Sequence, residues 1–244
     1  MTRLLLSISI LISMLALLAS GGAAAGQVSE FHTVVAEASG HYRQAGFYLR
    51  TGNTMVAAFE LAQMREKWGA LVDRFGKAPP DPYAQDAAWR ETLDNVGGRI
   101  ERSLAAVEAG DAAVAKTELA PVRSILGKLR RRNGVFLFSD CVDQANAAFR
   151  QLFQFRHAPP DFERWQEVDK LRRALAVTSH WYERCRDEAP VAYAQDPQFE
   201  RLMRTSLDSL SRIWAAIEGK DARRLISILR ELGSSDRLLY LRFG

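Results

Sequence analysis

The same pattern of residues occurs twice in this chain, 110 positions apart. Residues 83–86 read Tyr-Ala-Gln-Asp and return at 193–196, and residues 104–112 match residues 214–222 without a gap. The same offset pairs further apolar residues: Trp89 with Phe199, Leu93 with Met203, Ile100 with Leu210 and Leu119 with Leu229. Because two such matches in one register are not expected by chance, the sequence predicts an internal duplication.

Each copy is predicted to consist of four helices. In the first copy, apolar residues recur every three or four positions over 31–49, 55–75 and 89–107, which is the period of an amphipathic helix. Gly and Pro interrupt this period at 51–54, at 78–82 and at 110–111, where a tight hairpin leads into the fourth helix. On the second helix we expect these residues to face the core: Met55, Phe59, Ala62, Trp68, Leu71, Val72 and Phe75.

The second copy repeats this plan. A helix starts at Ser139 and stops at residues 157–160, Pro190 breaks the chain again, and residues 219–221 join the last two helices. The second of these helices is expected to bury Phe162, Trp165, Val168, Leu171, Leu175 and Trp181. Short connections favour antiparallel neighbours, and no alternating run predicts a strand. The predicted fold is therefore all-α, with two tandem up-down four-helix bundles at residues 26–138 and 139–244.

Residues 1–25 are typical of a signal peptide. Arg3 supplies a positive charge, residues 4–18 are apolar apart from three serines, and residues 23–25 suit signal peptidase. An uncleaved membrane anchor is the alternative, but the apolar run of about 15 residues is shorter than the roughly 20 that a spanning helix needs. No other apolar stretch is long enough to span a bilayer. We therefore predict a periplasmic or secreted protein with no transmembrane segment in its mature chain.

The chain has two cysteines, Cys141 and Cys185. In an exported protein a pair of cysteines usually forms a disulfide. Cys141 opens the first helix of the second copy and Cys185 lies near the end of the next helix, so both approach the same end of an antiparallel pair. We predict a structural disulfide between them, with two free buried thiols as the alternative.

The ends of the two fourth helices correspond to residues 126–131 (Leu-Gly-Lys-Leu-Arg-Arg) and 232–237 (Leu-Gly-Ser-Ser-Asp-Arg). With its up-down helices and tight turn between the third and fourth, each copy resembles the cytochrome c-prime family of four-helix bundles. That family attaches haem through C-x-x-C-H near the end of the fourth helix, and neither stretch contains Cys or His. The resemblance therefore implies the topology of the fold, excludes covalent haem and implies no function.

No residues of the sequence form a catalytic, cofactor or metal motif. Glu37 with His41 and His180 with Glu183 share helix faces, but a di-iron bundle needs Glu-x-x-His on each of two helices. Cys185 lies five positions from His180, on a different face of the helix, so the pair is not expected to activate the thiol. The histidines, which the duplication does not repeat, are His32, His41, His157 and His180.

Methionine and tryptophan residues are expected to fill the cores, because their spacing follows the helical period. A copper site or a ligand cage is the alternative for them. The residues are Met55, Met64, Met203, Trp68, Trp89, Trp165, Trp181 and Trp214. The adjacent glycines 97–98 inside the third helix indicate either close approach between the bundles or local weakness.

The charge pattern does not support nucleic-acid binding. The formal net charge is only +4, and export also argues against nucleic-acid binding. The basic cluster at residues 128–132 (Lys128, Arg130, Arg131, Arg132) is expected to be a solvated helix end, with a membrane- or polyanion-binding patch as the alternative. The apolar residues 238–243 are expected to pack into the last bundle, with an exposed partner-binding tail as the alternative.

We therefore expect a non-enzymatic, cofactor-free interaction or accessory module whose partner is another periplasmic or envelope protein. A periplasmic carrier of a small ligand, non-covalent haem or metal is the alternative function.

Overall fold

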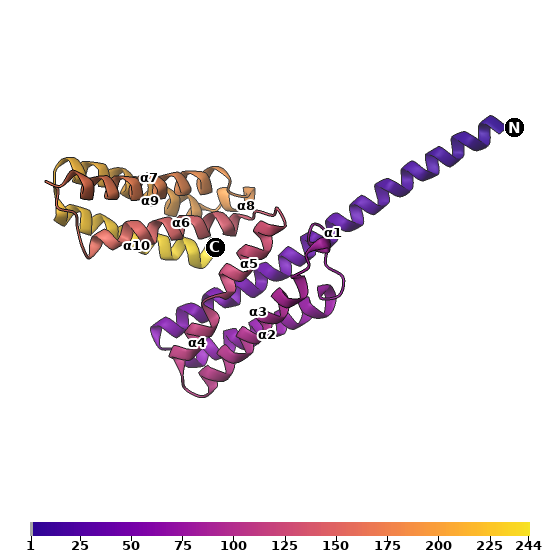
Figure 1. The fold of residues 1–244 in the computed structure, drawn as a ribbon, viewed down its shortest axis with the longest axis horizontal. Coiled ribbons are helices and arrows are strands. Elements are labelled where there is room, and N and C mark those ends of the chain that lie inside the picture. The colour runs from indigo at the N-terminus through magenta and orange to yellow at the C-terminus, as the bar shows by residue number, and fades with distance from the viewer. Residues whose placement is uncertain (1) are drawn as a thin grey trace. The chain divides into compact units, whose positions relative to one another are not determined.

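The computed structural model describes the backbone of residues 2–244 and the side chains of residues 26–244. Over residues 2–244 the chain is helical and contains no strand, so the predicted all-α class is confirmed. Contacts divide the chain into two compact units, Met1–Val135 (unit 1) and Phe136–Gly244 (unit 2), each with its own apolar core. Figure 1 shows that the long helices within each unit lie alongside one another.

Unit 1 contains, in chain order, α1 (Thr2–Thr51), α2 (Thr54–Phe75), the 3₁₀ turn η1 (Tyr83–Gln85), α3 (Trp89–Glu108), α4 (Ala112–Leu119) and α5 (Val122–Arg132). α1 and α2 form a hairpin at the break that the sequence predicts. Gly52 takes a φ of 83°, which only glycine adopts without steric cost, and the Asn53 side chain accepts a hydrogen bond from the Val56 amide.

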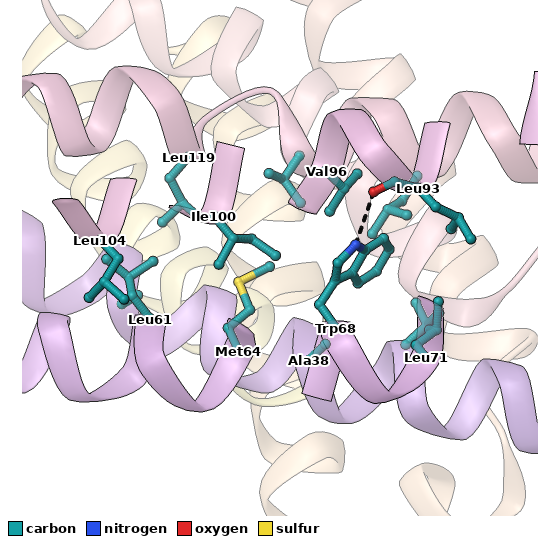
Figure 2. Close-up of a cluster of buried hydrophobic side chains, with 14 of the residues drawn as sticks. Ala38, Leu61, Met64, Trp68, Leu71, Leu93, Val96, Ile100, Leu104 and Leu119 are labelled. Carbon is teal, nitrogen blue, oxygen red and sulfur yellow. Dashed lines mark hydrogen bonds between the residues drawn. The ribbon is translucent and has the colours of Figure 1, made fainter. Parts of the chain in front are cut away.

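The core of unit 1 is packed closely between α2 and α3. The indole Nε1 of Trp68 donates a hydrogen bond to the carbonyl oxygen of Leu93 at 3.0 Å (Figure 2). A Cβ on Gly97 would lie 3.4 Å from Cδ1 of Trp68, which is an ordinary van der Waals contact, so the indole lies beside α3 at this position. Gly97 therefore faces another helix of its own unit.

The fourth helix of unit 1 is divided, although the sequence predicts a single helix there. α4 ends at Leu119 and α5 begins at Val122, because Pro121 has no amide hydrogen to continue the helical ladder. α4 lies against α3 and α1, and α5 lies against α3.

Unit 2 contains α6 (Phe138–Phe153), the 3₁₀ turn η2 (Gln154–Arg156), α7 (Trp165–Asp187), α8 (Val191–Ala194), α9 (Pro197–Glu218) and α10 (Ala222–Phe243). α6 packs on α7 and α10, and α9 packs on the same two helices. Leu239 and Phe243 are buried near the end of α10. The apolar chain end therefore packs into unit 2, and the prediction of its burial is confirmed.

Some residues that the sequence predicted to be buried are exposed. Met55 is 83% exposed and Phe59 60%, because they lie two positions, or about 200° of helix rotation, from the buried Ala57 and Leu61. Trp165 is 71% exposed because it is the first residue of α7, where the neighbouring side chains also face solvent. Trp214 is exposed as well, and Trp181 is partly buried. Among the methionine and tryptophan residues predicted to fill the cores, those that are buried are Met64, Met203, Trp68 and Trp89.

The basic cluster is also not simply a solvated helix end. Arg130 is buried, since it lies four residues from Leu126 on the packed face of α5. Arg132 Nε donates a hydrogen bond to Asp86 Oδ2 at 2.7 Å.

The predicted signal peptide at residues 1–25 lies outside the residues whose side chains are described. Among the helices of residues 26–244, none is long and apolar enough to cross a membrane.

Candidate binding groove

A surface groove of about 470 Å³ lies in unit 2, where the end of α7, α8 and the first half of α9 meet. Positions 199, 203 and 207 of α9 recur every four residues and form an apolar row, and positions 200, 204 and 208 form a charged row beside it. The complete lining is Arg186, Ala194, Phe199, Glu200, Met203, Arg204, Leu207 and Asp208.

The apolar floor of the groove rests on an aromatic cluster. The Phe199 ring centroid lies 5.1 Å from that of Phe243, 5.8 Å from that of Phe138 and 6.3 Å from that of Tyr193. Phe199 and Met203 are each only 2% exposed, so the edges of packed side chains form the floor. Because these rings hold one another in place, the floor is formed before anything binds.

The charged residues at the groove pair with neighbours. Arg204 Nη1 lies 3.1 Å from Glu200 Oε1. Arg186 Nε donates to Asp187 Oδ1 at 2.8 Å, and this hydrogen bond, with the charge of Asp187, raises the pKa of the guanidinium. Exposed pairs of this kind add little stability and remain available to orient a partner. The groove thus offers an apolar row bordered by both signs of charge.

The apolar residues of the groove are suited to binding apolar groups of a partner. Phe, Met, Leu and Ala side chains do not transfer protons or attack bonds, whereas apolar groups that enter such a groove leave water favourably. Comparison of the chain with protein-family models, with curated proteins and with solved structures finds no match. The function is therefore inferred from the geometry of the molecule.

A polar cluster is buried in the core of unit 2, on α6, α7 and α10. Asp236 Oδ1 accepts hydrogen bonds from the Tyr182 hydroxyl at 2.6 Å and from the Asn146 side-chain amide at 2.7 Å. Burial, then the charge of Asp236 and this hydrogen bond, raise the pKa of Tyr182 well above its usual value. The folded unit therefore holds the hydroxyl in its neutral, donating form. This cluster could not be predicted from the sequence, because its members are far apart in the chain.

The repeated Tyr-Ala-Gln-Asp motif has the same structural role in both units. Tyr83 and Tyr193 each pack on the aromatic residue six positions later, with ring centroids 5.3 and 6.3 Å apart and interplanar angles of 37° and 36°. Asp86 and Asp196 each accept a hydrogen bond from the amide two residues later, at 3.0 and 2.7 Å. The motif therefore sets the start of the third long helix in both units, and in unit 2 its Ala194 also lines the groove.

Cys141 and Cys185 lie at disulfide-bonding distance, with Sγ atoms 2.13 Å and Cα atoms 5.6 Å apart. Both residues are fully buried. The pair links the beginning of α6 to the end of α7. Arg186, which lines the groove, follows Cys185 directly in the chain.

The histidines are dispersed and do not converge on one point. Among residues 26–244, no three His, Cys, Asp or Glu side chains are grouped to hold a metal ion. Each histidine has a different neighbour: His32 hydrogen-bonds with Tyr83, His41 with Glu60 and His157 with Arg156, while the ring of His180 packs beside Trp181.

Proposed function

We propose that this protein is an exported, non-enzymatic interaction module whose unit 2 groove binds an apolar segment of another periplasmic or envelope protein. The observation that carries this proposal is the groove itself, with its apolar row at 199, 203 and 207. A row with a four-residue repeat is complementary to the apolar side of a partner helix. The flanking charges of Glu200 and Arg204 would fix the direction in which that partner lies.

The proposal includes the origin of the two units as copies of one four-helix bundle with the topology of the cytochrome c-prime family. With the 110-residue offset, α2 corresponds to α7, α3 to α9, and α4 with α5 to α10. Burial recurs at many of the paired positions without a gap in the offset. Among the pairs buried in both units are 31 and 141, 61 and 171, 75 and 185, 93 and 203, 100 and 210, 119 and 229, and 129 and 239.

Export is proposed from the signal-like pattern of residues 1–25. The cysteine pair at bonding distance supports export, because disulfides persist in oxidising compartments.

A photoreactive amino acid at Ala194 tests the groove in the producing cell. Ala194 is exposed on α8 and lines the groove, while Ala192 is exposed on the same short helix and does not line it. We expect a discrete cross-linked product from position 194, no product from position 192, and loss of the product when Leu207→Glu places a charge in the apolar row. Equal products from both positions, or none from either, would contradict docking in the groove.

A carrier of a small ligand is the second candidate, because the groove volume is within the range of small-molecule sites. Native mass spectrometry and an absorption spectrum of the protein purified from the periplasm distinguish a carrier from an interaction module. A constant added mass, a Soret band or a stoichiometric metal would favour the carrier. A colourless protein of the expected mass would favour the interaction module.

A further inference from the structure

The first two helices are joined differently in the two units, at the same position. Phe31 of α1 and Phe75 of α2 are both buried, and their rings meet edge to face with centroids 5.6 Å apart. Positions 31 and 75, moved by the offset of 110, become 141 and 185, which are the cysteine pair of α6 and α7. A sulfur–sulfur pair in unit 2 thus stands where an aromatic pair stands in unit 1.

The junction in unit 1 does not depend on redox conditions. Phe31 also packs on Tyr83 and Trp89, with ring centroids 5.3 and 5.1 Å apart, and Trp89 Nε1 donates a hydrogen bond to the Phe75 carbonyl oxygen at 3.0 Å. Aromatic contacts and an indole–carbonyl hydrogen bond are unaffected by a reductant. Both cysteines of the chain are in unit 2.

The junction in unit 2 depends on its covalent bond. Two cysteine side chains bury less apolar area than two phenylalanines, so they contribute less to the hydrophobic effect. The bond offsets this difference by restricting the unfolded chain across a sequence separation of 44 residues. Once it is broken, two small thiols remain where unit 1 has two interlocked rings.

We propose that unit 2 is the redox-dependent half of the protein, so that the groove keeps its binding geometry only while Cys141 and Cys185 are bonded. In the reductive step, a dithiol reductant attacks one sulfur as a thiolate, and the sulfur–sulfur bond breaks to give a mixed disulfide. The second thiol of the reductant then closes its own disulfide. Cys141 and Cys185 end as two thiols, having gained two electrons and two protons.

The position of the pair connects this step to binding. Cys185 is followed by Arg186, which lines the groove, and α7 and α9 pack together beside it. Loss of the link to α6 removes the covalent restraint on the end of α7, which carries Arg186 at the groove. The module would therefore be inactive before export and bind once the pair is oxidised. This consequence for binding rests on the proposed function of the groove, whereas the effect on stability does not.

Hydrogen exchange with and without dithiothreitol tests the effect on stability in the intact protein. We expect reduction to increase exchange in α6 and α7 and to lower the melting temperature of unit 2 by roughly 10 °C or more, with exchange in α1 and α2 unchanged. Equal changes in both units, or no change in either after mass spectrometry shows two free thiols, would overturn the proposal.

The double variant Cys141→Phe/Cys185→Phe, which copies the aromatic pair of unit 1, is expected to be insensitive to dithiothreitol. If these rings prevent folding, Cys141→Ala/Cys185→Ala serves instead. This variant should show the exchange of the reduced wild-type protein in both the presence and the absence of reductant. A reductant effect that persists in either cysteine-free variant would show that the pair is not its cause.

Cross-linking from Ala194 connects the redox state with binding. We expect the product to form in the oxidised protein and to be lost after reduction. Redox-dependent exchange without any product in the oxidised protein would reject the groove as a docking site and leave the redox-dependent stability of unit 2 intact. An undiminished product in the reduced protein would overturn the redox control of binding.

Discussion

Lys220 holds an unusual backbone conformation in the hairpin between α9 and α10. Its φ is 51°, in the left-handed region, and the corresponding residue of unit 1 is Gly110 with a φ of 81°. A residue with a Cβ pays a steric cost in this region that glycine does not. The ion pair of Lys220 with Glu163 is exposed and therefore compensates little.

Lys220→Gly is expected to raise the free energy of unfolding of unit 2 by about 0.5–1 kcal/mol, because relief of the steric cost exceeds the added entropy of the unfolded chain. Urea denaturation measures the change. The matched control is Gly110→Ala, which should lower the stability of unit 1 by about 1 kcal/mol. A destabilised Lys220→Gly variant would show that the side chain has a role beyond the turn.

Tyr182 is the donor of a buried hydrogen bond, and its removal leaves Asp236 with one partner fewer. Tyr182→Phe is expected to destabilise unit 2 by about 1–3 kcal/mol at neutral pH. Because the folded pKa of Tyr182 is raised, its contribution is complete below the unfolded pKa of about 10 and is lost as the pH rises above that value.

Urea denaturation of both proteins between pH 8 and pH 11 checks this expectation. The difference in stability between wild type and Tyr182→Phe should narrow as the pH rises above about 10. A constant difference over this range would show that Tyr182 ionises equally easily in both states. Tyr48→Phe in unit 1 is the control for removal of a tyrosine elsewhere.

An aspartate stabilises the start of each of α3 and α9: Asp86 and Asp196, respectively. Asp86 accepts more side-chain hydrogen bonds than Asp196. Asp86 Oδ2 accepts hydrogen bonds from Arg132 at 2.7 Å and from Asn133 at 2.6 Å. Burial favours a higher pKa, but these hydrogen bonds, that from the Ala88 amide and the charge of Arg132 together lower the pKa of Asp86. In unit 1 this carboxylate therefore joins the start of α3 to the end of α5.

Asp196→Ala is expected to cost unit 2 about 1 kcal/mol, as for loss of a helix cap, and Asp86→Ala is expected to cost unit 1 about 2–3 kcal/mol. The contribution of Asp86 is present above its unfolded pKa of about 4 and is lost as the pH falls through its lower folded pKa. Thermal melts from pH 7 to pH 3 should show the wild type approaching Asp86→Ala. Equal costs for both variants would contradict the wider role of Asp86.

The end of α10 is part of the unit 2 core. Truncation after Ser235 removes the buried Leu239 and Phe243, together with Asp236 of the polar cluster. We expect loss of cooperative unfolding in unit 2, measured by differential scanning calorimetry. Leu238→Ser, at a half-exposed position of the same helix, should change stability little. A truncated protein with an unchanged melting temperature would instead indicate that the chain end is dispensable.

Each unit has an apolar core of its own, so the chain has two independent sources of hydrophobic stabilisation. A fragment of residues 136–244 is expected to fold under oxidising conditions and to unfold in one cooperative transition. Circular dichroism and the transition in urea measure this. A fragment that is helical but melts without a cooperative transition would show that unit 2 requires unit 1.

The export proposal applies to the whole chain. If residues 1–25 are a signal peptide, the mature protein purified from the periplasm should begin at Gly26, as measured by N-terminal sequencing. An intact N-terminus on protein from the cytoplasm would reject export.

Helices and their ends were largely predictable from sequence. The Gly52-Asn53 break and the hairpin capped by Asp111 occur where the residues indicate, because turn and capping preferences act over a few neighbouring positions. The division at Pro121 was missed, although proline is itself a local signal. Met55 and Phe59 were placed in the core because their spacing is helical, yet spacing alone does not identify which face a neighbouring helix covers.

Contacts between helices that are far apart in the sequence could not be predicted from local residue patterns. The hydrogen bonds of Tyr182 and Asn146 with Asp236 join α6, α7 and α10, and the groove requires α7, α8 and α9 to meet. The offset of 110 residues that relates Phe31 and Phe75 to Cys141 and Cys185 can be read from the sequence. Its meaning depends on each pair being in contact. Local chemistry specifies where a helix forms, whereas the rotation of each helix against its neighbours specifies which side chains meet, and that depends on the packing of the whole core.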